Sequence, residues 1–144
     1  MKFNYIIVLN MSSILNIKTY FDVIKNEYYY KNDLIIIAGP TGVGKSSLAV
    51  KLAQLINGVL INADSVQVYK DLELLSARPS KIDLDQVQHL LYGYVNSNVN
   101  YSVSDWLRRL NIVLKDVQKA KKVAILVGGS GLYINAAING LAQI

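Results

Sequence analysis

A phosphate-binding loop is the most specific chemical pattern in this sequence. Residues 39–46 read GPTGVGKS, which satisfies G-x-x-x-x-G-K-[ST]. The glycines let successive backbone N–H groups point inward at an anion, and Lys45 adds a full positive charge. The Ser46 hydroxyl can act as a ligand of Mg²⁺. The pattern predicts a site for a nucleotide whose terminal phosphoryl group moves, or for a diphosphate that departs.

Asp64 is a second candidate for chemistry, because it follows the short apolar run at residues 59–62 almost directly. The carboxyl ends of parallel strands form the edge at which α/β folds place their sites. If this strand neighbours the strand before the loop, the Asp64 carboxylate faces the phosphate site. There it could bind Mg²⁺ through water or accept a proton from a nucleophile. Alternatively, Asp64 only caps the next turn, a common role of Asp-Ser.

The last apolar run, at residues 123–127, ends in glycines instead of an acidic residue. The residues that follow it are Gly128, Gly129, Ser130 and Gly131. P-loop proteins that hydrolyse nucleotides place an aspartate at such a position, where it holds Mg²⁺. A glycine turn leaves the backbone and the Ser130 hydroxyl free to approach a ligand closely. The spacing is equally compatible with an ordinary strand-to-helix turn.

Short apolar runs alternate with helical patterns from residue 34 onward. Residues 34–38, 59–62 and 123–127 have the length and composition of strands buried on both faces of a sheet. Residues 66–80 are predicted as a turn or a short helix, and residues 89–95 as a possible further strand. The alternation predicts an α/β fold, a parallel sheet with helices on both faces.

Helices are predicted between these strands, and a further one begins near Leu132. The first covers residues 46–56 and ends near Gly58. Its side chains expected to face the core are Leu48, Leu52 and Leu55. The second opens with Ser102 and Asp105 in the S-x-x-D spacing of a capping box. Its buried stripe is predicted to be Trp106, Leu107, Leu110, Val113, Leu114 and Val117.

The chain divides into two parts at residue 32. Residues 33–144 are predicted to form one domain, a P-loop NTPase-like parallel sheet flanked by helices. Residues 1–32 are predicted to be a mainly helical extension, with apolar side chains recurring at spacings of three and four. These side chains are Ile14, Ile17, Phe21, Ile24 and Tyr28. A signal peptide is rejected, since Asn10 interrupts the first apolar run and no small-residue cleavage site follows.

The composition indicates a globular protein. Of the 144 residues, 52% are apolar and 17% are charged, which suits one domain with its own core. The sequence contains no cysteine, so a disulfide framework is excluded and a reducing cytoplasm is expected. No apolar stretch reaches the roughly 18 residues of a membrane span. The net charge of +5 is compatible with a polyanionic partner.

Basic residues cluster in the last third of the chain, with Asp116 as the one acid among them. The members are Arg108, Arg109, Lys115, Lys119, Lys121 and Lys122. They could meet nucleic-acid phosphates, but a solvated helix face is the favoured interpretation. His89 is the single histidine of the sequence. It is predicted to pack or form hydrogen bonds, because no second histidine or cysteine stands near it.

Four stretches together resemble one enzyme family. They are IAGPTGVGKSSLAV, INADSVQVYKDLELLSARPS, YSVSDW and VGGSGLYINAAINGL, in this order. The chain resembles the tRNA dimethylallyltransferases from about Leu34 to Leu141. The P-loop is shared by many families, whereas ADSVQVY and GGSGLY at these distances are specific to this one. The resemblance implies transfer of a dimethylallyl group from dimethylallyl diphosphate to N6 of the adenosine 3′-adjacent to the tRNA anticodon, releasing pyrophosphate.

The resemblance also implies roles for individual residues. The diphosphate would be bound by Gly39, Pro40, Thr41, Gly42, Val43, Gly44, Lys45 and Ser46. Asp64 would be the general base, with Lys45 and Thr41 also catalytic. Contacts with the tRNA anticodon stem-loop would come from Asp64, Ser65, Val66, Gln67 and Ser130. Mg²⁺ would share the charge of the diphosphate, with Ser46 as its ligand. A cytoplasmic monomer without membrane attachment is expected.

Length is the main departure from the family, whose members are about twice as long. The C-terminal half of the family, with the helical insertion that grips the anticodon stem, has no counterpart here, and residues 1–32 match nothing in it. Three alternatives therefore stay open. The chain could prenylate free adenine nucleotides, as adenylate isopentenyltransferases do. It could be an ATP-dependent small-molecule kinase. It could also be a truncated product that folds around the P-loop without turnover.

Overall fold

A parallel sheet forms the centre of the molecule in the computed structural model, which describes residues 2–8, 33–72, 78–129 and 131–141. Within this part of the chain the strands are β1 (Lys2–Val8), β2 (Asp33–Ala38), β3 (Gly58–Asn62), β4 (His89–Leu90) and β5 (Val123–Gly128). Their order across the sheet is β1-β2-β5-β3-β4, and every neighbouring pair is parallel. The predicted strands at 34–38, 59–62 and 123–127 are confirmed.

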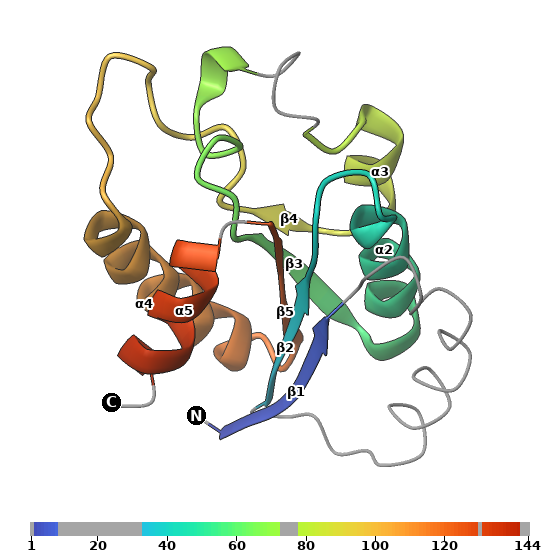
Figure 1. Cartoon of the computed structure of the whole chain (residues 1–144). Helices are drawn as coiled ribbons and strands as arrows, with labels where there is room; N and C mark the ends of the chain where they lie inside the picture. Colours follow the sequence, from blue (N-terminus) through green and yellow to red (C-terminus); the bar gives the residue numbers. More distant parts are fainter. Residues whose placement is uncertain (1, 9–32, 73–77, 130, 142–144) are drawn as a thin grey trace.

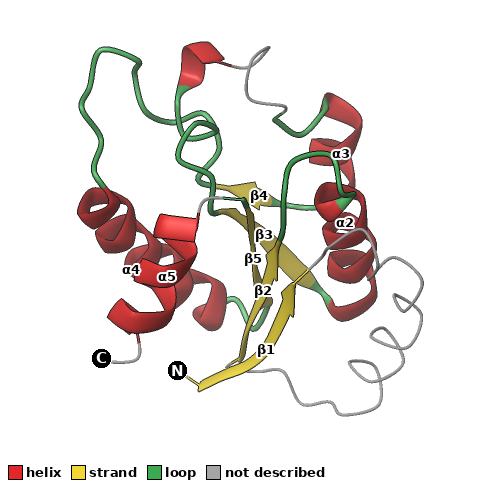
Figure 2. Cartoon of the chain, in the orientation of Figure 1, coloured by secondary structure: helices red, strands yellow, loops and turns green. Residues whose placement is uncertain are grey.

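Helices cover both faces of this sheet, as Figures 1 and 2 show. Helices α2 (Lys45–Ile56) and α3 (Lys81–Gln86) lie on one side, and α4 (Val103–Lys119) and α5 (Gly131–Leu141) on the other. Alternate residues of β2 enter the two cores: Leu34 and Ile36 join the α4–α5 side, whereas Ile35 and Ile37 join the α2 side. The predicted α/β class is confirmed, since a parallel sheet needs helices on both faces to keep its strands out of water.

The three central strands end at the same edge of the sheet. Ala38 at the end of β2 is paired with Gly128 at the end of β5, and Val127 is paired with Asn62 at the end of β3. The segments after these ends carry the P-loop, the glycine turn and Asp64. The sequence-based argument for Asp64 assumed that β3 is the neighbour of β2. The structure shows instead that β5 lies between them. The shared edge brings Asp64 to the loop nevertheless.

Helix α2 is correctly predicted in extent but not in the whole of its buried face. Leu48 and Leu52 are buried, whereas Leu55 is 61% exposed. The buried face is centred instead on Ala49 and Ala53, whose small side chains let the helix approach the sheet closely. Leu55 therefore lies at the margin of the contact, since successive residues turn by about 100° around a helix.

The end of α2 also differs from the prediction. Asn57, with φ of 56°, takes the left-handed position that ends the helix, and Gly58 is already the first residue of β3. Gly58 is needed for a different reason. A Cβ atom there would lie 2.6 Å from Cδ1 of Ile125 and 3.0 Å from Cα of Ala53. The glycine thus permits the close packing of α2 on the sheet.

Strand β1 corrects the prediction of a helical extension for residues 2–8. It pairs in parallel with β2, from Lys2 opposite Asp33 to Val8 opposite Ala38. The segment KFNYIIV is rich in β-branched and aromatic residues, which favour extended structure, and β2 has an edge that another strand can cover. The predicted amphipathic helix from Ser12 onward lies outside the described residues.

The second half of the chain follows the prediction more closely. Helix α4 begins with the expected capping box, and its buried side chains are Trp106, Leu110, Val113, Leu114 and Val117, with Leu107 partly buried. Helix α5 begins close to Leu132, as expected. The possible strand at 89–95 is reduced to the two residues of β4 and an isolated bridge between Tyr69 and Val95. The short helix α3, capped by Ser80, was not predicted.

Residues 66–80 contain a short 3₁₀ helix at Lys70–Leu72, in agreement with the predicted turn or short helix. Residues 73–77 lie outside the described part. Among the residues that the structure describes, no helix is both long and apolar enough to cross a membrane.

The capping box of α4 provides a test of the fold. The hydroxyl of Ser102 accepts a hydrogen bond from the backbone N–H of Asp105 at 3.1 Å, and Oδ2 of Asp105 accepts one from the N–H of Ser102 at 2.9 Å. We expect Ser102→Ala to lower the free energy of unfolding by about 1 kcal/mol. The exposed Ser104, two residues further along, is the control. Ser104→Ala should change the free energy of unfolding by less than half as much as Ser102→Ala. Equal losses in urea unfolding of the two variants would contradict the capping role.

Candidate active site

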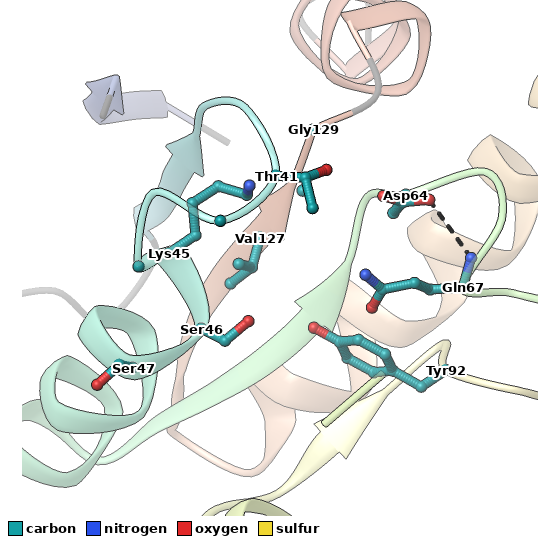
Figure 3. Close-up of a pocket in the computed structure, with 12 residues that line it drawn as sticks. Thr41, Lys45, Ser46, Ser47, Asp64, Gln67, Tyr92, Val127 and Gly129 are labelled. Carbon is teal, nitrogen blue, oxygen red and sulfur yellow. Dashed lines mark hydrogen bonds between the residues drawn. The ribbon is translucent and has the colours of Figure 1, made fainter. Parts of the chain in front are cut away.

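A cavity of about 360 Å³ lies at the carboxyl edge of the sheet, between the P-loop and the segments that follow β3, β4 and β5. Figure 3 shows its two walls, with Lys45 and Ser46 on one side and Asp64, Gln67 and Tyr92 on the other. The residues that line it are Thr41, Gly42, Gly44, Lys45, Ser46, Ser47, Asp64, Gln67, Tyr92, Val127, Gly128 and Gly129. The cavity therefore joins the two features that the sequence singled out.

The P-loop wall is built for an anion. Gly42 and Gly44 have φ of 81° and 93°, a left-handed region that side chains disfavour. Gly44 precedes the first turn of α2 and, as a glycine, offers no side chain to cap it, so the first N–H groups of the helix remain available to a ligand. Nζ of Lys45 donates a hydrogen bond to the carbonyl oxygen of Pro40 at 2.7 Å. The ammonium group is thereby held over the loop.

The charge of Asp64 acts on Lys45 across the cavity. Removal of the ammonium group from water lowers the pKa of Lys45 below its ordinary value, and the negative charge of Asp64 partly offsets this by raising it. The cavity thus combines a cation suited to phosphate oxygens with a carboxylate suited to accepting a proton.

Asp64 is half-buried and its carboxylate is fixed by its own turn. Oδ1 accepts hydrogen bonds from the backbone N–H groups of Val66 at 2.8 Å and of Gln67 at 3.4 Å. Asp64 therefore caps the next turn, and it also lines the cavity, so the capping interpretation does not exclude the role in chemistry, which stays a prediction. Ala63 extends the pairing of β3 and β5 by one bond, its N–H donating to the carbonyl of Val127 at 2.8 Å.

The glycine turn after β5 closes the third side. A Cβ atom on Gly128 would lie 2.2 Å from the carbonyl oxygen of Ala63, and one on Gly129 would lie 3.2 Å from the carbonyl oxygen of Gly39. These contacts involve backbone atoms, which cannot turn aside as a flexible side chain can. The absence of side chains at this turn therefore lets the ends of β2, β5 and β3 meet around one cavity.

Tyr92 is a cavity residue that the sequence did not indicate. It follows β4, and in Figure 3 its hydroxyl points toward the side of Ser46. Burial raises the pKa of Tyr92 above its ordinary value, and the charge of Asp64 raises it further. The hydroxyl is therefore neutral near pH 7 and able to donate a hydrogen bond into the cavity. The possible strand at 89–95 was the available signal, because residues after a parallel strand reach this edge.

Most of the predicted site residues lie around this cavity. Those that line it are Thr41, Gly42, Gly44, Lys45, Ser46, Asp64 and Gln67. Gly39 and Pro40 contribute backbone to the loop without lining the cavity, and the side chain of Val43 is buried in the core beneath α2. Ser65 and Val66 are exposed and also do not line it. Ser130 is outside the described residues. The lining residues not predicted as site residues, besides Tyr92, are Ser47, Val127, and Gly128 and Gly129 of the glycine turn.

The side-chain oxygens that line the cavity are suitable ligands for a hard cation. Ser46 offers a hydroxyl oxygen and Asp64 a carboxylate, and Mg²⁺ prefers oxygen ligands. The described part of the chain contains no group of three or more His, Cys, Asp or Glu side chains that could hold a metal ion. A Mg²⁺ ion here would accordingly depend on phosphate oxygens and water for its remaining ligands, which is its usual mode of binding.

Two other sequence-based assignments concern residues away from the cavity. Nδ1 of His89 lies 2.9 Å from the carbonyl oxygen of Val87, and its ring meets Tyr92 edge to face at 5.5 Å between centroids. This agrees with the packed, hydrogen-bonding histidine that was expected. In the basic cluster, Arg108 is exposed and pairs with Asp105 one turn before it.

Comparison with known proteins gives one consistent family. A family model described as IPP transferase matches residues 67–144. The tRNA dimethylallyltransferase of Pelagibacter ubique is 48% identical over 114 residues, which are 79% of this chain and 36% of that protein. The tRNA dimethylallyltransferase of Methylobacterium nodulans is 52% identical over 110 residues, which are 76% of this chain and 36% of that protein.

Solved structures agree with these relatives. A tRNA isopentenylpyrophosphate transferase from Bacillus halodurans superposes with a TM-score of 0.73 at 34% identity, covering 76% of this chain and 36% of that one. A eukaryotic dimethylallyltransferase acting on tRNA superposes with a TM-score of 0.67 at 35% identity, covering 70% of this chain and 25% of that one. The chain thus spans little more than a third of the length of the curated relatives it matches.

The close approach at Gly128 predicts a cost for any side chain there. We expect Gly128→Ala to lower the free energy of unfolding by roughly 1–3 kcal/mol, because its Cβ meets the backbone of Ala63 and must push β3 and β5 apart. Gly131→Ala is the matched control, since a Cβ on Gly131 meets no atom within 4 Å. Urea unfolding of both variants decides the matter, and an unchanged stability of Gly128→Ala would refute the backbone contact.

Proposed function

The chain belongs to the IPP transferase family, and from this premise we propose that it provides the diphosphate-binding and proton-accepting part of a tRNA dimethylallyltransferase. The reaction would move a dimethylallyl group from dimethylallyl diphosphate to N6 of the adenosine 3′-adjacent to the tRNA anticodon. One observation carries the proposal: the P-loop and the Asp64 carboxylate line the same cavity, while β5 between them ends in glycines instead of an acidic residue.

That arrangement favours a departing diphosphate over a transferred phosphoryl group. Phosphoryl transfer by P-loop proteins depends on an aspartate at the end of a second strand to hold Mg²⁺ against the terminal phosphates. Here Gly128 and Gly129 occupy that position, and they leave Asp64 as the carboxylate facing Lys45 across the cavity. A carboxylate on the wall that faces the loop is suited to taking a proton from an acceptor molecule.

The proposed reaction breaks the bond between the allylic carbon and the diphosphate oxygen, whose electron pair leaves with pyrophosphate. A new bond forms from the same carbon to N6 of the adenosine. An exocyclic adenine amine is a weak nucleophile, and Asp64 would accept the proton that N6 loses as this bond develops. The carboxylate is already oriented by the N–H groups of Val66 and Gln67.

The other wall would stabilise the leaving group. Lys45, Thr41 and two glycines of the loop line the cavity. There the ammonium group, the hydroxyl and backbone N–H groups of the loop would meet the negative charge that grows on the departing diphosphate. Mg²⁺, for which Ser46 is the proposed ligand, would supply further neutralisation of that charge when bound. Tyr92 adds a neutral hydroxyl on the opposite wall.

The target adenine would have to leave the stacked anticodon loop to reach this cavity. Gln67 lies beside Asp64 and is the proposed RNA contact within the cavity. Ser65 and Val66 are exposed outside the cavity lining and are proposed as further RNA contacts. Ser130 stays a predicted contact. A cytoplasmic location belongs to the same proposal, because that is where tRNA substrates would be met, and a monomeric state likewise stays a prediction.

The first experiment is calorimetric titration of the chain with dimethylallyl diphosphate and, separately, with ATP, both with Mg²⁺. We expect clear preference for the allylic diphosphate. Lys45→Ala should weaken binding roughly 10- to 100-fold, since a charge-assisted contact is lost. Lys51→Ala is the control, because Lys51 is exposed on the same helix and does not line the cavity.

Preference for ATP over dimethylallyl diphosphate would overturn the proposal in favour of a kinase. A prenylation assay with AMP in place of tRNA tests the other alternative, because activity on free AMP would identify an adenylate isopentenyltransferase.

Substitution of Asp64 separates binding from chemistry. We expect Asp64→Asn to lower the rate of tRNA prenylation by on the order of 10²–10⁴-fold through loss of the proton acceptor. Affinity for dimethylallyl diphosphate near pH 7 should change little. The exposed Asp85 of α3 provides the control, and Asp85→Asn should leave both quantities as they are.

Asp64→Asn should also shift the pH dependence of diphosphate binding. Diphosphate binding requires protonated Lys45, whose pKa lies below its ordinary value of 10.5, so affinity should fall as pH rises through this lowered pKa. The Asp64 charge raises that pKa. Its removal in Asp64→Asn should therefore move the alkaline loss of affinity to lower pH, as measured by titrations across the alkaline range. A shift to higher pH would contradict the coupling of the two groups.

A further inference from the structure

Asn62 is a fully buried polar side chain at the end of β3, with 0% of its surface exposed. Among the described residues it stands apart in this, because the other fully buried side chains are apolar. Burial of an amide is costly unless its donors and acceptors are paired. Both N–H groups and the oxygen of Asn62 are indeed paired, and their partners lie in the two segments that carry Asp64 and Tyr92 to one wall of the cavity.

The first partner is the backbone of Asp64. Oδ1 of Asn62 accepts a hydrogen bond from the N–H of Asp64 at 2.9 Å, and Nδ2 donates one to the carbonyl oxygen of Asp64 at 2.9 Å. The side chain therefore holds both polar groups of one residue, as a neighbouring strand would. This clamp fixes the backbone orientation from which the Asp64 carboxylate projects.

The second partner is Leu91, which directly follows β4, the strand paired with β3. Nδ2 of Asn62 also donates to the carbonyl oxygen of Leu91 at 3.1 Å. Leu91 has φ of 64°, a left-handed conformation that is unfavourable for a bulky residue, and Tyr92 of the cavity follows it directly. The bond from Asn62 helps to hold Leu91 in this conformation and so sets the path by which Tyr92 reaches the cavity.

Asn62 is itself held from a third side. The indole Nε1–H of the buried Trp106 donates to the backbone carbonyl of Asn62 at 3.0 Å, and the ring of Trp106 stacks on Tyr133 at 4.5 Å between centroids. Helix α4 thereby braces the end of β3 against α5. The core therefore fixes the position of the Asn62 side-chain amide, and this amide in turn fixes the backbone of Asp64.

We propose that Asn62 is a positioning residue of this site, whose buried amide holds Asp64 and Tyr92 in place on the wall of the cavity that faces the P-loop. The inference rests on the proposed function of Asp64 as proton acceptor. Displacement of a reacting group by about 1 Å can cost on the order of 10²-fold in rate. Loss of the Asn62 amide should therefore slow transfer of the dimethylallyl group without lowering the affinity of the P-loop for the diphosphate.

The test compares Asn62→Ala with Leu114→Ala. Leu114 is buried in α4 and takes no part in the cavity, so its truncation destabilises the fold without touching Asp64. In single-turnover prenylation well below the unfolding temperature, we expect Asn62→Ala to lower the transfer rate about 10²-fold while the Kd for dimethylallyl diphosphate stays within about twofold. Leu114→Ala should leave both near the wild-type values. An equal loss in the two variants, or none in Asn62→Ala, would overturn the proposal.

A second measurement needs no turnover and keeps this proposal separate from the proposed function. In ¹⁵N-labelled protein, the amide shift of Val66 should follow the titration of the Asp64 carboxyl, because that N–H donates to Oδ1 of Asp64. We expect this response to be lost in Asn62→Ala and kept in Leu114→Ala. An unchanged response in Asn62→Ala would refute the positioning role even if the wild-type chain proved inactive. Absence of transfer by the wild-type chain, with the response lost as expected, would count against the proposed function alone.

Discussion

Strand β5 lies between the strand that leads into the P-loop and the strand that leads to Asp64, and its last residues set the width of the cavity. Their register aligns three strand ends at one edge, where Gly128 passes so close to the backbone of Ala63 that a Cβ would lie 2.2 Å from its carbonyl oxygen. Any side chain there would separate β3 from β5. Lys45 and Asp64 follow β2 and β3, two strands that are not neighbours, and they share a cavity because this backbone contact is possible.

The charges of the cavity depend on that closeness. Lys45 loses hydration at the loop, which lowers its pKa, and the facing carboxylate of Asp64 partly compensates. Such a pair suits a substrate that brings its own negative charge to one wall and needs a proton acceptor at the other. Behind the wall that carries Asp64, buried polar groups are also paired. The Asn62 amide donates to the carbonyl of Leu91, and the Trp106 indole donates to the carbonyl of Asn62.

Local patterns accounted for a large part of this structure. The P-loop, the capping box at Ser102 and the apolar runs each depend on residues close in sequence, and all were found where predicted. The errors lie where distant segments meet. Leu55 belongs to the apolar pattern of α2, yet it is exposed because Ala49 and Ala53 form the closer contact with the sheet. Residues 2–8 form a strand because the edge of β2 accepts one.

The chemical groups of the site could be listed from residue types alone: a glycine-rich loop with Lys45 and Ser46, a carboxylate after the second strand, and a glycine turn after the last. These follow from residue types and short spacings, which are local properties. Other features are visible in the folded chain alone: β5 separates β2 from β3, Tyr92 joins the cavity, and Asn62 clamps Asp64. Strand order and buried hydrogen bonds between distant segments depend on how elements pack, and that is settled by the whole core at once.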